Sequence, residues 1–62
     1  MKNIKLVEAR KKCHLTQAKV AEKVGISEVS YQRIEYGAQR PSLNTAILIA
    51  KTLKSTVEWL FG

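Results

Sequence analysis

The chain has 62 residues and a formal net charge of +6 at pH 7, from 11 Lys and Arg against 5 Asp and Glu. This length allows one small domain, residues 1–62, and the single cysteine excludes an intramolecular disulfide and a zinc cluster built from cysteines. No apolar run approaches the roughly 20 residues that span a bilayer, and the N-terminus lacks the apolar core of a signal peptide. We therefore expect a cytoplasmic protein without membrane contact, whose basic surface attracts a polyanion.

The first part of the chain predicts two short helices. One is expected from about Asn3 to Cys13, with His14 ending it. A second is expected after Thr16, whose hydroxyl suits an N-cap, and Gly25 ends it because Gly adopts a left-handed backbone conformation without steric cost. Its inward residues are predicted to be Val20, Ala21 and Val24.

The rest of the chain predicts three more helices and no strand. Ser27 is expected to cap the third helix and Gly37 to end it, while Ser42 and Thr56 are expected to cap the fourth and fifth. The predicted inward residues of the third and fourth helices are Tyr31, Ile34, Leu43, Ala46, Ile47, Ile49, Ala50 and Leu53.

The second and third helices have the features of a helix-turn-helix unit. The turn between them is only Gly25-Ile26-Ser27, with Ile26 as an apolar plug. Ala21, four residues before the Gly, is small enough to let the two helices cross closely. In such units the second helix enters the major groove of DNA. The side chains left on its outer surface are Ser27, Glu28, Val29, Ser30, Gln32 and Arg33.

Catalytic and metal sites are not expected. The chain has one His, one Cys and no Asp, and the adjacent Cys13 and His14 diverge at a helix end instead of forming a nucleophile and base pair. It has no phosphate-cradling Gly loop, no nucleotide fingerprint and no metal-ligand spacing. We expect no enzyme activity, no metal and no cofactor.

Characteristic segments extend along the whole chain: Leu15-Thr16-Gln17, Val20-Ala21, Val24-Gly25-Ile26-Ser27, Ile34-Glu35, Gly37, Pro41-Ser42-Leu43, Ile49-Ala50, Leu53 and Trp59-Leu60. With these segments the chain resembles the phage repressor and Cro-like, or XRE-like, helix-turn-helix DNA-binding family. The resemblance implies an all-α, compact five-helix bundle of the lambda repressor-like class. It also implies a bacterial or phage-encoded protein at the nucleoid, with double-stranded DNA as its partner.

The resemblance further implies roles for single side chains. The base-reading positions that it implies are Ser27, Glu28, Val29 and Arg33. The residues expected at the DNA backbone are Thr16, Gln17, Ser30, Gln32, Tyr36 and Arg40. Arg10 and Glu35 match a partly buried ion pair that ties the first helix to the end of the third. Three positions depart from the family's usual residues: His14 and Lys54 replace Gly, and Tyr36 replaces Asn.

The chemistry of the outer side chains leaves alternatives open. Arg33 can read guanine through O6 and N7, or it can contact a phosphate. Glu28 can accept a hydrogen bond from the cytosine N4 amino group, or it only stabilises the helix dipole and excludes wrong sites. Val29 suits a thymine methyl group, and Gln32 either contacts the backbone or faces away from the groove.

Exposed apolar residues in the C-terminal third predict a dimer. Leu48 lies away from the main apolar face of its helix, and with Trp59 and Phe61 it is predicted to form a homodimer interface. A symmetric dimer places two recognition helices about 34 Å apart, which fits a palindromic operator. We therefore expect a homodimeric, sequence-specific transcriptional repressor. Two alternatives remain: an antitoxin-like subunit that holds an unidentified protein partner and binds DNA secondarily, and a structural module that has lost DNA binding.

Overall fold

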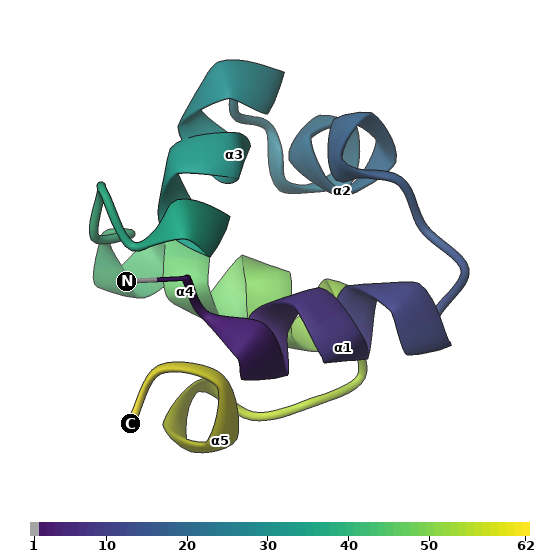
Figure 1. Ribbon diagram of the computed structural model, residues 1–62, viewed down its shortest axis with the longest axis vertical. Coiled ribbons are helices and arrows are strands. Elements are labelled where there is room, and N and C mark those ends of the chain that lie inside the picture. Colours follow the sequence, from purple (N-terminus) through teal and green to yellow (C-terminus); the bar gives the residue numbers. More distant parts are fainter. Residues whose placement is uncertain (1) are drawn as a thin grey trace.

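The helices of the computed structural model begin and end close to where the sequence predicts them (Figure 1). The structure describes residues 2–62. The helices are α1 (Ile4–Lys12), α2 (Gln17–Val24), α3 (Glu28–Tyr36), α4 (Leu43–Thr52) and α5 (Val57–Phe61). No strand occurs in this part of the chain. The predicted all-α, five-helix fold is therefore confirmed.

Each helix begins at a polar side chain that accepts a hydrogen bond from the first turn. The hydroxyls of Thr16, Ser27, Ser42 and Thr56 cap α2 to α5 by accepting from the backbone N–H three residues later, as predicted. Helix α1 uses the amide of Asn3 in the same way, because its side-chain oxygen accepts from the N–H of Leu6 at 3.1 Å. Local hydrogen bonds of this kind explain why the helix starts are readable from sequence.

After each of the first four helices, one residue adopts the left-handed backbone conformation. Gly25 and Gly37 have φ angles of 86° and 77°, and His14 and Lys54 have φ angles of 57° and 55°. Apart from Gly25 and its two chain neighbours, no heavy atom of the described residues lies within 4 Å of the position that a Cβ on Gly25 would take, so the backbone conformation and not a lack of space favours Gly there. His14 and Lys54 adopt this conformation with side chains, at a cost of roughly 1 kcal/mol each.

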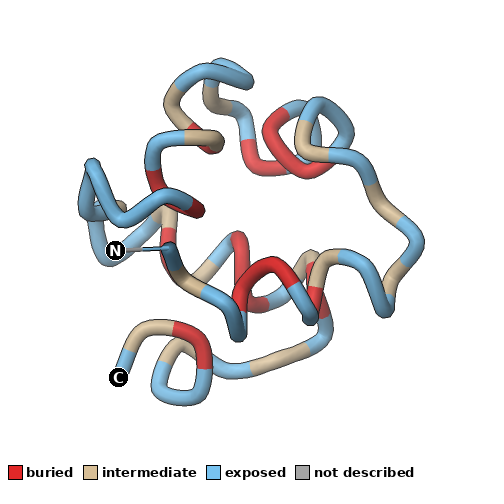
Figure 2. Tube along the Cα trace, viewed as in Figure 1, coloured by how far each residue is buried: buried red, intermediate tan, exposed pale blue. Residues whose placement is uncertain are grey.

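The helices enclose one apolar core. Helix α2 packs on α3 and α4, α1 packs on α3 and α5, and α4 packs on α5. In Figure 1, α2 and α3 lie on one side of the molecule and α1 and α5 on the other. Figure 2 shows the buried residues turned toward the centre of this arrangement. The most deeply buried apolar side chains are Leu6, Val20, Ala21, Tyr31, Ile34, Ile49, Leu53 and Leu60.

The inward face of α4 differs from the prediction at its first residue. Leu43 was expected in the core but is 71% exposed, and Ile47 is only half-buried. Leu43 opens α4, where the apolar stripe leaves the core and reaches a shallow surface groove that it lines with Val57 and Phe61. The buried stripe of α4 therefore begins one turn later, at Ala46.

Three further observations bear on the kinds of site this fold offers. None of the helices in residues 2–62 is long and apolar enough to cross a membrane. Over the same residues, no group of three or more His, Cys, Asp and Glu side chains is placed to hold a metal ion. Cys13 is half-buried, and its Sγ lies 3.5 Å from the carbonyl oxygen of Leu53.

Candidate nucleic-acid interface

Helix α3 has one buried face and one exposed face. Tyr31, Ile34 and Glu35 are buried, at the three- and four-residue spacing of a helix stripe. The opposite side, which we call the outer face of α3, consists of Glu28, Val29, Gln32, Arg33 and Tyr36. All of these are exposed except Gln32, which is half-buried. The structure therefore brings most of the predicted recognition residues onto one surface.

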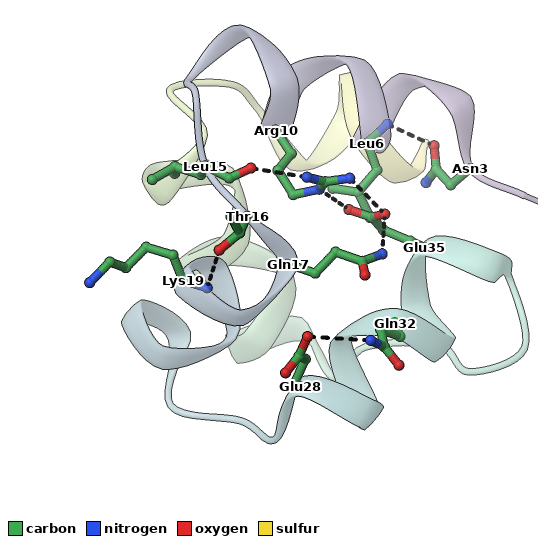
Figure 3. A network of polar contacts seen from close by, with 10 residues as sticks. All are labelled: Asn3, Leu6, Arg10, Leu15, Thr16, Gln17, Lys19, Glu28, Gln32 and Glu35. Carbon is green, nitrogen blue, oxygen red and sulfur yellow. Dashed lines mark hydrogen bonds and ion pairs between the residues drawn. The ribbon is translucent and has the colours of Figure 1, made fainter.

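Polar side chains at the N-terminal end of α3 bond to one another. Ser27 Oγ accepts from the backbone N–H of Ser30 at 3.1 Å and donates to Ser30 Oγ at 3.0 Å. On the outer face, Gln32 Nε2 donates to Glu28 Oε2 at 3.4 Å (Figure 3). Gln32 therefore shares a surface with Glu28, and these contacts orient both side chains.

A buried ion pair joins α3 to α1 (Figure 3). Arg10 Nε donates to Glu35 Oε2 at 2.7 Å, and the side chains of Arg10 and Glu35 are 13% and 2% exposed. Arg10 Nη1 also donates to the carbonyl oxygen of Leu15 at 2.9 Å, in the loop that leads into α2. The pair expected from the resemblance is thus present and reaches a third segment of the chain.

Gln17 extends this pair into a network and is less free for DNA than predicted. Its Nε2 donates to Glu35 Oε1 at 2.9 Å, and its side chain is half-buried. One amide hydrogen is therefore used inside the protein, and only the second remains for a phosphate. Thr16 is exposed beside it, so the N-terminal turn of α2 keeps the backbone N–H groups that suit an anion. We call Arg10, Gln17 and Glu35 the interhelical network.

The electrostatics of Glu35 follow from these contacts. Burial by itself raises the pKa of the Glu35 carboxyl, but hydrogen bonds from Arg10 and Gln17 and the nearby Tyr31 hydroxyl outweigh burial and lower the pKa from its ordinary 4.5. Burial, and then the Glu35 carboxylate, raise the pKa of Tyr31 well above its ordinary 10.0. Among residues 2–62 the Tyr31 hydroxyl has no partner with normal hydrogen-bond geometry. Glu35 is therefore charged and Tyr31 neutral at physiological pH.

Two residues near the N-terminus meet the C-terminal end of α3, which the sequence patterns did not reveal. The backbone N–H of Asn3 donates to the carbonyl oxygen of Glu35 at 2.7 Å, and Asn3 Nδ2 donates to the carbonyl oxygen of Leu60 at 2.8 Å. Lys2 Nζ lies 5.9 Å from the centroid of the Tyr36 ring. No periodicity or spacing rule links these positions, so the sequence carries no signal for them.

Arg40 lies exposed in the loop between α3 and α4. It lines the same shallow groove as Lys2, Leu43 and Phe61. Two cationic side chains from distant parts of the sequence therefore line one groove beside the C-terminal end of α3, at the opposite end of this helix from Glu28.

The three predicted dimer residues lie in different surroundings. Leu48 and Trp59 are 45% and 49% exposed, and Lys5 Nζ lies 5.4 Å from the centroid of the Trp59 ring. Phe61 is half-buried and packs against the core. Leu48 and Trp59 thus offer apolar surface to a partner, whereas Phe61 is already partly used by the fold.

Comparison with known proteins identifies the family. A helix-turn-helix family model matches residues 6–60. Over 58 residues the chain is 34% identical to the cryptic phage CTXphi transcriptional repressor RstR of Vibrio cholerae, covering 94% of this chain and 52% of RstR. It is 31% identical to the uncharacterized HTH-type transcriptional regulator YobD of Bacillus subtilis, again over 94% of this chain and 52% of that protein. The chain therefore spans about half the length of these curated relatives.

Solved structures agree with this assignment. The P22 c2 repressor in complex with a synthetic operator matches with a TM-score of 0.84 and 25% identity, over 89% of this chain and 83% of that one. This likeness confirms the fold of the chain. The chain belongs to the phage repressor and Cro-like, or XRE, helix-turn-helix family of DNA-binding proteins.

Proposed function

We propose that this chain is the DNA-binding domain of a sequence-specific transcriptional regulator, a repressor that acts as a homodimer on a palindromic operator in a bacterial or phage-infected cell. The observation that carries the proposal is the outer face of α3, an exposed polar surface held in place from behind by the interhelical network. RstR, which is a transcriptional repressor, supports the direction of regulation. No cofactor is needed for this activity.

Base reading is assigned to the first two turns of α3. In helix-turn-helix proteins, the N-terminal part of the recognition helix meets the base edges. Arg33 and Val29 are exposed on the outer face, where they reach guanine and a thymine methyl respectively. Glu28, oriented by Gln32, selects for a cytosine amino group at its position.

Backbone contacts are assigned to the surroundings of α3. The first turn of α2, with Thr16 and Gln17, binds a phosphate from one side. Arg40 binds from the α3–α4 loop on the other side, and Ser30 adds a hydroxyl. These contacts fix register and carry most of the salt dependence, because each neutralised phosphate releases counterions.

The test begins with selection of bound sites from random duplexes at near-physiological salt, followed by titration of the selected site and a scrambled one. Arg33→Ala is expected to weaken binding to the selected site by about 1–3 kcal/mol and to relax the preference at one position. Arg40→Ala is the matched control, since it is expected to weaken binding to both duplexes alike. Equal losses for Arg33→Ala on both duplexes would show that Arg33 contacts only phosphate.

The dimer is tested separately. Exposed Leu48 and Trp59 support an apolar interface between α4 and α5 of two copies. Sedimentation up to high micromolar concentration, with and without the selected duplex, is expected to show a dimer that Leu48→Glu weakens. A monomer mass under every condition contradicts the homodimer. A second chain that co-purifies would instead assign the same surface to a protein partner.

A further inference from the structure

The C-terminal end of α3 carries a cation that helical patterning does not assign. Lys2 Nζ lies 5.9 Å from the centroid of the Tyr36 ring, and Tyr36 continues the outer face of α3 beyond Gln32 and Arg33. An ammonium over an aromatic ring is attracted by the electron-rich face of that ring. The contact therefore adds a positive charge to the last turn of the outer face.

Lys2 is placed there by its neighbour. The N–H of Asn3 donates to the Glu35 carbonyl at 2.7 Å, and the Asn3 side chain is bonded to both Leu6 and Leu60. One of these hydrogen bonds holds the residue next to Lys2 against the end of α3, and the other two tie it to α1 and α5. The backbone of Lys2 is consequently anchored beside Tyr36, and the cation costs less entropy to localise than one on a free tail.

The surroundings of this cation favour an anion. Lys2 and Arg40 line one groove with Gln39 and Asn3, and no carboxylate side chain of the described residues lines that groove. The acidic residue of the outer face, Glu28, lies at the other end of α3, where it is held by Gln32. The outer face of α3 therefore carries an acidic side chain at its N-terminal end and lies beside two cationic side chains at its C-terminal end.

We propose that Lys2, held over the ring of Tyr36, binds a DNA backbone phosphate beside Arg40, so that the two cations clamp one strand at the C-terminal end of α3. This inference rests on the proposed DNA-binding function. A recognition helix that meets base edges with its N-terminal residues departs from the groove at its C-terminal end, where the flanking phosphates lie. The clamp adds affinity and register without sequence preference.

The test compares Lys2→Gln with Lys5→Gln. Lys5 is the matched control because it has the same charge and a similar contact, 5.4 Å from the centroid of Trp59. Helix α5, which carries Trp59, lies on the opposite side of the molecule from α2 (Figure 1). The association constant is measured on the selected duplex and a scrambled one across a range of salt concentrations, after sedimentation has shown equal masses for all variants. At physiological salt, a charge farther than about 8 Å from the DNA is largely screened.

Lys2→Gln is expected to lower the association constants for both duplexes by the same factor. It is also expected to reduce the steepness of log K against log salt by about 1. Lys5→Gln is expected to leave the slope unchanged. Wild-type protein that binds no duplex contradicts the proposed function itself. Wild-type protein that binds, with the same slope for Lys2→Gln as for wild type, overturns the clamp alone.

The role of the ring is tested by repeating Lys2→Gln in two backgrounds. Tyr36→Phe keeps the ring and removes the hydroxyl, so the effect of Lys2→Gln is expected to persist in full. Tyr36→Leu removes the ring, so the effect is expected to shrink. An equal effect in both backgrounds overturns the assignment of Tyr36 as the residue that positions Lys2.

Discussion

The two faces of α3 belong to one helix of nine residues but have different roles. The buried face carries Tyr31, Ile34 and Glu35, and through Glu35 it is bonded to α1 and α2. The outer face carries side chains that bond mostly to one another or to nothing in the protein. A small domain thus separates stability from recognition across one helix diameter, and substitutions on the two faces should separate in the same way.

The largest difference between the two faces is expected when one arginine is replaced on each. Arg10→Ala leaves Glu35 charged and buried without its partner, so we expect a loss of about 3–5 kcal/mol in the free energy of unfolding. Arg33→Ala removes the same side chain from the outer face and is expected to change stability by no more than about 0.5 kcal/mol. Urea denaturation monitored by circular dichroism measures the free energy of unfolding of both variants. Similar losses for the two variants would show that the faces are not separable.

The acid sensitivity of the buried face gives a second prediction. The pKa of Glu35 is lower in the folded protein than the ordinary 4.5 expected in the unfolded chain. Its contribution to stability is therefore fully present above about 4.5 and is lost as pH falls through the lowered value, because the unfolded state then binds the proton more readily. Urea midpoints measured from neutral to acidic pH should fall more steeply for wild type than for Glu35→Gln. Parallel curves would contradict this role for Glu35.

A third prediction concerns Asn3, which bonds to Glu35 in α3 and to Leu60 in α5. Asn3→Ala removes both the cap of α1 and the bond to the Leu60 carbonyl. We expect a loss of about 1–2 kcal/mol in the free energy of unfolding. Asn3→Asp keeps an oxygen for the cap but has no donor for Leu60, so its stability should fall between those of wild type and Asn3→Ala. An Asp variant as stable as wild type would show that the Leu60 bond contributes nothing.

The smallest expected effect lies outside both faces. His14 has a φ of 57°, a conformation that Gly adopts without steric cost. His14→Gly should raise the free energy of unfolding by about 0.5 kcal/mol, since relief of strain exceeds the added entropy of the unfolded chain. Glu8→Gly, at an exposed position in the middle of α1, should instead lower it by about 1 kcal/mol. Destabilisation by His14→Gly would show that the His side chain contributes more to stability than its left-handed backbone conformation costs.

The helix boundaries and the helix-turn-helix unit were predictable from sequence because their causes are local. A cap such as Ser27 bonds to an N–H three residues away, and a left-handed Gly25 ends its helix through its own backbone. The buried face of α3 followed from helical spacing, and the family resemblance supplied the Arg10 and Glu35 pair. The expected burial of Leu43 was wrong because periodicity gives the direction of a side chain and not where the core ends.

The helices, the helix-turn-helix unit and the excess of positive charge could therefore be read from the sequence. The meeting of the two ends of the chain depends on the packing of the whole domain, since Asn3 bonds to Leu60 across 57 residues of sequence. The same packing turned the Gln17 amide toward Glu35 and brought Lys2 over Tyr36. These contacts depend on how the helices pack together, and that packing is set by burial of the whole apolar core instead of by any short segment.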